Sequence, residues 1–251
     1  MSVNQVFATL VAGFAAGLIN AVAGGGTLVS FPILLSIGLS PLDANITNTI
    51  SSVLGHAGSA YSQRKFLNGF GGKIKTWIVS AGIGGILGSL LLRLLPEKVF
   101  ENVVPILIFL ACALLGSQTT LKRLIESKRA RSRSTNRNVI IISAIFFSAI
   151  YGGYFGAGLG IILISILGLT LNEGITESNS LKAVLSFAVN ISASLFFVFT
   201  GHVNWFSVGL MSISSLLGGL IGGKIAYRIH PKLLKYIVIT FGIAVGLRML
   251  A

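Results

Sequence analysis

Long apolar stretches fill most of the chain and limit it to a membrane-spanning fold. They cover residues 4–22, 45–63, 76–95, 102–116, 183–199, 205–223 and 236–247. Several reach the ~20 residues that a helix needs to cross a bilayer. Charged residues make up 10% of the chain and mean hydropathy is +0.89, whereas a soluble domain has roughly 25% charged residues. We therefore predict an all-α polytopic membrane protein.

The net charge of +13 does not indicate a nucleic-acid partner, because the basic residues lie in short segments between the apolar stretches. That pattern is typical of the loops that face the cytoplasm. The most basic segment, 117–138, is predicted to be a cytoplasmic linker between two membrane repeats, residues 1–116 and 139–251. The surroundings are then a lipid bilayer, and we expect the protein in the plasma membrane or the inner membrane of the cell.

Each half divides into five apolar segments, at about 4–22, 27–38, 45–63, 74–95 and 100–116, and at 139–153, 158–170, 181–199, 203–223 and 233–250. If successive segments alternate sides, 16 of 19 Lys and Arg lie on one side, with Lys182 counted in a loop at 171–182. Four spans per half would give a split of 12 to 7. The charge bias therefore predicts repeats of inverted orientation.

Two glycine-rich breaks interrupt the apolar segments at matching places. The first break contains Gly24-Gly25-Gly26-Thr27 and the second contains Gly156-Ala157-Gly158. An asparagine follows each break at the same distance: Asn48 lies 23 positions after Gly25, and Asn179 lies 23 positions after Gly156. Paired interruptions of this kind indicate a transporter substrate site, although glycine clusters also serve close helix packing. Because the flanking segments 139–153 and 158–170 reach only about 20 Å at 1.5 Å per residue, re-entrant hairpins and full crossings both stay open. Packing is the expected role of a second repeated set, Gly84, Gly85 and Gly88 with Gly218, Gly219, Gly222 and Gly223.

A helix that starts after such a break directs N–H groups and the positive end of its dipole back at the break, which favours an anion. Glycine also permits a turn with positive φ, expected at Gly25 and Gly156. The candidate substrate-binding residues are Gly24, Gly25, Gly26, Thr27, Asn48, Gly156, Gly158 and Asn179. For the two asparagines a simple role as helix N-caps remains an alternative.

His56 lies near the middle of the 45–63 segment, and an ionisable residue there is a candidate proton carrier. The alternative is a neutral histidine bonded to a backbone carbonyl. None of the six acidic residues lies at the centre of a predicted span, which disfavours a cation pathway. One cysteine and three scattered histidines offer no metal site. We expect no catalytic residue and no cofactor, and hence no enzyme.

Residues 17–32, GLINAVAGGGTLVSFP, and 44–48, ANITN, resemble the TauE/SafE family of sulfite-exporter-like permeases. Residues 153–160, GYFGAGLG, and 173–179, EGITESN, are similar to the family's second repeat, but without the proline that often follows it. The resemblance implies a permease for sulfite, sulfoacetate or another organosulfonate, although members are usually described with eight spans. We expect a secondary transporter working by alternating access. The alternatives are an anion channel and a permease for a small organic anion without sulfur, and the oligomeric state stays open.

Overall fold

A computed structural model describes residues 1–67, 69–128, 137–171, 174–200, 203–226, 228 and 232–250, and these residues form ten α-helices and one short 3-10 helix, with no strand. The first half contains α1 (Val3–Val22), α2 (Thr27–Ser36), α3 (Pro41–Gln63), η1 (Arg64–Leu67), α4 (Lys73–Leu94) and α5 (Glu97–Lys128). The second half contains α6 (Arg137–Tyr154), α7 (Leu159–Thr170), α8 (Ile175–Thr200), α9 (Trp205–Ile225) and α10 (Lys232–Leu250). The predicted all-α class is confirmed.

Each of the ten predicted apolar segments corresponds to one helix, but some helices begin or end elsewhere than expected. α3 begins at Pro41 because Ser40 is its N-cap, with a side chain that accepts from the amide of Asp43 at 3.2 Å. α5 continues to Lys128, well into the segment that was predicted as a linker. The centre of that segment, 129–136, lies outside the described residues.

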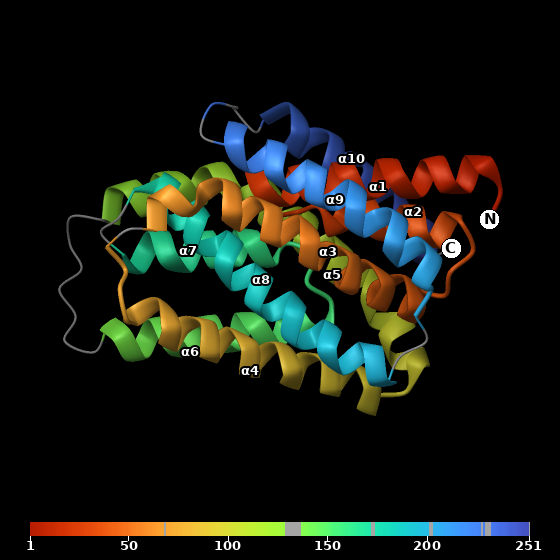
Figure 1. Cartoon of the computed structure of the whole chain (residues 1–251), viewed down its shortest axis with the longest axis horizontal. Coiled ribbons are helices and arrows are strands. Elements are labelled where there is room, and N and C mark those ends of the chain that lie inside the picture. Colours follow the sequence, from red (N-terminus) through yellow and green to blue (C-terminus); the bar gives the residue numbers. More distant parts are fainter. Residues whose placement is uncertain are drawn as a thin grey trace.

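The helices run roughly along the long axis of the molecule, and both termini lie at the same end (Figure 1). α1 starts at that end and stops near the middle, and α2 leads back toward the same end. α6 and α7 make the corresponding hairpin in the opposite half of the molecule. The two breaks therefore meet in the interior, approached from opposite ends.

The two halves pack against each other in a reciprocal pattern. Helix α9 of the second half packs against α1 and α3 of the first half. In the same way, α4 of the first half packs against α6 and α8 of the second. The glycines of α4 and α9 make these contacts close: a Cβ on Gly88 would fall on the carbonyl oxygen of Ile150, and one on Gly219 would fall on that of Gly55. The packing role predicted for this second glycine set is confirmed, since small residues let helix backbones approach.

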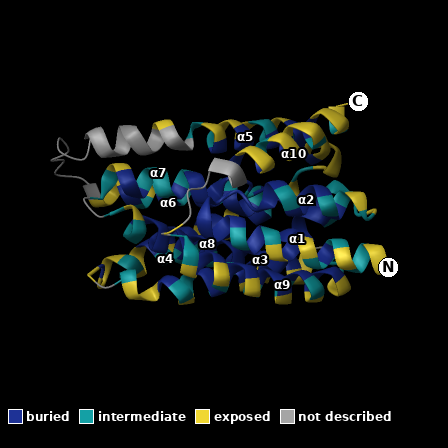
Figure 2. Ribbon diagram, turned by 90° about the horizontal axis from the view of Figure 1, so that it is seen from above, coloured by how far each residue is buried: buried dark blue, intermediate teal, exposed yellow. Residues whose placement is uncertain are grey.

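The outer surface is apolar and the polar positions of several helices face inward. Buried residues fill the middle of the bundle, with exposed residues around it (Figure 2). Large apolar side chains such as Phe7, Phe147 and Phe199 are exposed. Within the described part of the chain, five helices are long and apolar enough to cross a membrane: α1, α4, α8, α9 and the Glu97–Ser117 part of α5. A surface of this kind is suited to lipid.

Candidate functional site

The two glycine breaks touch each other through their backbones. Gly24, at the start of the first break, has φ +85°, and a Cβ there would lie 2.8 Å from Cα and C of Gly160. A Cβ on Gly160, in the first turn of α7, would lie 2.6 Å from Cα of Gly24. Neither position has room for a side chain, so the close approach of the two hairpins depends on glycine at both.

A side chain from the preceding helix fixes each break from within its own half. Asn20 Oδ1, in the last turn of α1, accepts from the amide of Gly26 at 2.7 Å. Tyr151, in the last turn of α6, donates its hydroxyl to the carbonyl of Ala157 at 2.5 Å. In each half the side chain and the backbone group that it binds are six positions apart. Tyr151 lies 131 positions after Asn20, and Ala157 lies 131 positions after Gly26. Sequence reasoning missed this pair because the two residue types differ, although the equal spacing was visible.

The helix that ends at each break is capped by the other half. The last carbonyls of a helix have no partner inside it and need an external donor. Asn45 of α3 donates Nδ2 to the carbonyl of Tyr154, the last residue of α6, at 2.9 Å. Asn179 of α8 donates Nδ2 to the carbonyl of Ala21 in α1 at 3.1 Å. α3 and α8 therefore connect the two halves at the breaks.

Asn48 and Asn179 are not helix N-caps, which removes that alternative. Asn48 lies two turns inside α3 and binds α2, since its Oδ1 accepts from Ser30 Oγ at 2.5 Å and its Nδ2 donates to Thr27 Oγ1 at 3.3 Å. Asn179 lies one turn inside α8, and its Nδ2 also donates to Gln63 Oε1 at 2.6 Å. Both side chains hold neighbouring elements together around the breaks.

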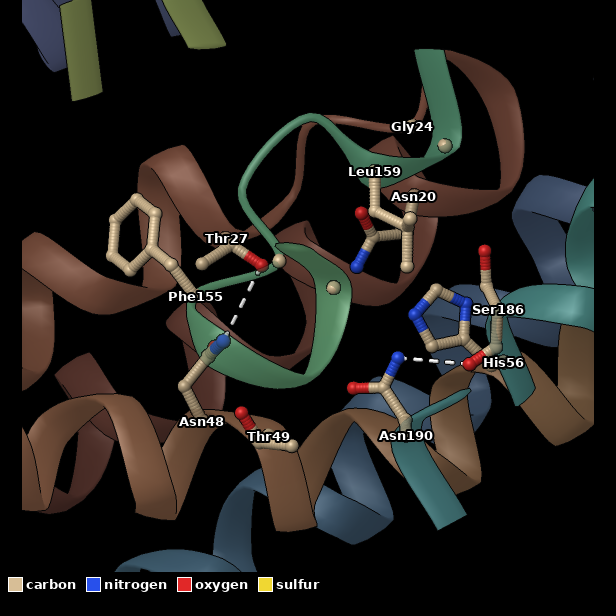
Figure 3. Close-up of a pocket in the computed structure, with 13 residues that line it drawn as sticks. Asn20, Gly24, Thr27, Asn48, Thr49, His56, Phe155, Leu159, Ser186 and Asn190 are labelled. Carbon is tan, nitrogen blue, oxygen red and sulfur yellow. Dashed lines mark hydrogen bonds between the residues drawn. The ribbon is translucent and has the colours of Figure 1, made fainter. Parts of the chain in front are cut away.

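A small cavity opens where the breaks meet α3 and α8 (Figure 3). Of the predicted site residues it is lined by Gly24, Thr27, Asn48, Gly156 and His56. Its wall also includes polar residues that sequence reasoning did not single out: Asn20, Thr49, Ser186 and Asn190. The volume that the centre of a water molecule can occupy inside the cavity is about 10 Å³. A volume of that size holds about one water molecule. The cavity is therefore narrow and has less room than a sulfite ion needs.

The other four predicted residues, Gly25, Gly26, Gly158 and Asn179, are not part of the cavity lining. Gly25 faces the side chain of Leu115 and is not among the glycines with positive φ, so the expected positive φ belongs to Gly24 in its place. Gly156 does have the expected positive φ, at +75°. Gly26 packs on α1, and Gly158, at φ +79°, is the N-cap of α7.

The expected cluster of unpaired amides is largely satisfied by the breaks themselves. The amide of Leu28 donates to the carbonyl of Gly25, and those of Val29 and Ser30 donate to Gly26. In the second half the amide of Leu159 donates to Gly156 in the same way. Polar side chains therefore supply more of the cavity's chemistry than the sequence reasoning assumed.

His56 lines the cavity from α3, in the company of Ser186 and Asn190 from α8 (Figure 3). Its side chain is partly buried. Within the described part of the chain the imidazole has no hydrogen-bond partner, so the alternative of a histidine bonded to a backbone carbonyl is not met. The ring is placed to contact whatever enters the cavity.

Lys182 is not part of a loop, as the charge count assumed. α8 begins at Ile175, and Lys182 lies two turns inside it with an exposed fraction of 2%. It belongs to a polar stripe on α8 formed by Asn179, Lys182, Ser186 and Asn190. Residues three and four apart share one helix face, so this spacing was the signal that sequence reasoning overlooked. Without Lys182 the charge split is 15 to 3, and the predicted orientation is unchanged.

Comparison with known proteins places this architecture among transporters. The family model described as "Sulfite exporter TauE/SafE" matches residues 9–249. A "Probable membrane transporter protein ORF9" from Sinorhizobium is 28% identical over 244 residues, which is 96% of this chain and 90% of that protein. A "Probable membrane transporter protein" from Haemophilus influenzae is 28% identical over 94% of this chain and 91% of its own length. In Escherichia coli, "Probable membrane transporter protein YfcA" is 24% identical over 94% and 86%.

Proposed function

Since this chain belongs to the sulfite exporter TauE/SafE family, we propose that it is a secondary transporter for a small sulfur-containing anion such as sulfite, sulfoacetate or another organosulfonate. Its relatives carry the name "Probable membrane transporter protein", and this chain is a multi-pass membrane protein. The observation that supports the site is the small polar cavity where the two breaks meet α3 and α8. Substrate passes through unchanged, so no residue has a catalytic role.

Two features of the cavity support an anion as the cargo. Among the residues that the structure describes, its wall contains the hydrogen-bond donors of Asn20, Asn48, Ser186 and Asn190 and no carboxylate. Amide and hydroxyl groups donate hydrogen bonds to the lone pairs of an oxyanion, and they carry no negative charge that would repel it. Neutral donors also release the ion again, which a transport cycle requires.

Alternating access follows from the small volume of the cavity and the arrangement of the hairpins. A cavity with room for about one water holds no sulfite until its wall moves. We assign that movement to the α1–α2 and α6–α7 hairpins as re-entrant elements of inverted repeats. In support, they approach the site from opposite ends and contact each other at Gly24 and Gly160 (Figure 1). Opening one hairpin at a time would expose the cavity to one side.

Transport by purified protein in liposomes tests this function. Vesicles are loaded with unlabelled sulfite, sulfate, sulfoacetate, taurine, chloride or acetate, and uptake of the labelled anion is followed against protein-free vesicles. We expect saturable uptake of a sulfur-containing anion, accelerated by the same anion inside. Unitary currents in planar bilayers would show an anion channel. Uptake accelerated by internal acetate alone would indicate a carboxylate as the substrate. No uptake of any anion would reject the proposal.

A further inference from the structure

The amino group of Lys182 is buried at the meeting point of the two hairpins. Its Nζ donates to the carbonyl oxygens of Asn20 at 2.9 Å and Ala21 at 3.2 Å, both in the last turn of α1. Asn20 is also part of the cavity wall. On the other side, a Cβ on Gly160 would lie 3.2 Å from Lys182 Cδ. The lysine therefore stands behind the cavity wall at the contact between the two breaks.

Among the described residues, no carboxylate lies in an ion pair with Lys182. The six acidic residues of the chain are Asp43, Glu97, Glu101, Glu126, Glu173 and Glu177. The two partners of Lys182 are neutral carbonyls. An unpaired charge buried in a membrane protein is costly and is kept where it serves a function.

Capping the end of α1 does not by itself require a charge. At the equivalent end of α6 the carbonyl of Tyr154 accepts from the neutral amide of Asn45. The position equivalent to Lys182 in the first half is Ser51, at the same offset of 131. The ends of α1 and α6 occupy matching places in the two halves, but among the described residues only the end of α1 has a lysine beside it.

The neighbours of Lys182 on α8 leave hydrogen-bonding capacity beside it. Ser186, one turn along, lines the cavity with an exposed fraction of 1%, and its hydroxyl has no partner among the described residues. Asn179, one turn back, has an unpartnered Oδ1. An ammonium has three N–H donors, and two of those of Lys182 are used. One N–H and the Ser186 hydroxyl remain for a ligand.

We propose that Lys182 is the charge partner of the transported anion, an inference that rests on the proposed function. On binding, the ammonium donates its remaining N–H to an oxygen of the anion, while Ser186 donates its hydroxyl to the same ion. The class of ligand is a small oxyanion with a full negative charge.

The test compares two buried lysines that both donate to a backbone carbonyl. Lys182→Gln keeps an amide to cap α1, as Asn45 does for α6, and removes only the charge. Lys182→Arg keeps the charge. The matched control is Lys235→Gln, because Lys235 is also buried and donates to the carbonyl of Gly116, away from the cavity lining. Affinity for sulfite, sulfoacetate and the zwitterion taurine is measured in detergent by calorimetry, together with flux in liposomes.

We expect Lys182→Gln to weaken sulfite and sulfoacetate binding by about tenfold to a hundredfold, since a hydrogen bond to a charged group is lost. Taurine, which carries its own cation, should lose less. Lys182→Arg should recover most of the loss and Lys235→Gln should bind as the wild type does. A folded Lys182→Gln variant with wild-type affinities would show that Lys182 is only a cap.

Two further outcomes are decisive. If Lys182→Gln does not fold, the wild-type protein labelled with ¹⁵N at lysine Nζ is titrated with sulfite. The Nζ signal of Lys182 is assigned as the one that is missing from the spectrum of Lys182→Arg. That signal should shift when sulfite is added, and a signal that does not shift overturns the inference. If the wild type neither binds nor moves any anion of the panel, the proposed function fails and the inference fails with it. Wild-type transport with an unaffected Lys182→Gln variant rejects the inference alone.

Discussion

Replacing Gly24 by alanine should destabilise the protein strongly, whereas the same change at its neighbour Gly25 should not. Gly24 has φ +85°, and a left-handed conformation costs a residue with a Cβ roughly 1–2 kcal/mol. The new Cβ would also lie 2.8 Å from two backbone atoms of Gly160, which have little freedom to move. Overpacking of this kind costs about 1–3 kcal/mol. Together we expect a loss of about 2–5 kcal/mol in the free energy of unfolding.

Gly25 provides the matched control because it is adjacent and lies in the same break. Its φ is not positive, and the nearest atoms to a Cβ there would be side-chain carbons of Leu115 at 3.4 Å and Leu28 at 3.8 Å, which is ordinary van der Waals contact. Its alanine variant should stay within about 0.5 kcal/mol of the wild type.

The assay is the midpoint of thermal unfolding in detergent, followed by intrinsic fluorescence and by retention of the monodisperse peak. For a chain of this size 1 kcal/mol corresponds to roughly 2–4 °C, so Gly24→Ala should lower the midpoint by about 4–20 °C. Equal midpoints for Gly24→Ala and Gly25→Ala would refute the argument, because they would mean that the two breaks do not touch at Gly24 and Gly160.

Three further predictions concern the orientation and the cavity. Ser2→Cys and Asn138→Cys should be labelled from opposite sides of the membrane by an impermeant maleimide, since the charge bias puts the start of the second repeat in the cytoplasm; labelling from one side would contradict inverted repeats. Asn48→Ala should lower the free energy of unfolding by about 1–3 kcal/mol and reduce flux, because the bonds to Thr27 and Ser30 are lost, and unchanged melting and flux would contradict this. If transport is proton-linked, His56→Gln should keep binding but flatten the pH dependence of flux between about pH 5 and 8, and an unaltered pH profile would exclude His56 as the carrier.

The sequence by itself determined the fold class and the division into helices. Apolar length fixes the spans because the bilayer thickness fixes them, so the predicted segments and the helices agree closely. The matched glycine breaks located the region of the site for a similar reason, since irregular backbone inside a membrane requires protein or a water-filled cavity around it. Both conclusions depend on local properties that can be read along a single chain.

What only the tertiary structure decided is which side chains meet at that region. Gly24 rather than Gly25 takes the positive φ because its backbone lies against Gly160, 136 positions later in the chain. Lys182 resembled a loop residue because charge alone suggests solvent, yet its ammonium binds the end of α1 from the other half. Such contacts join residues more than a hundred positions apart, and their partners are set by how the two hairpins dock. Local pattern predicts helices and breaks, and the packing of one half on the other determines which groups line the cavity.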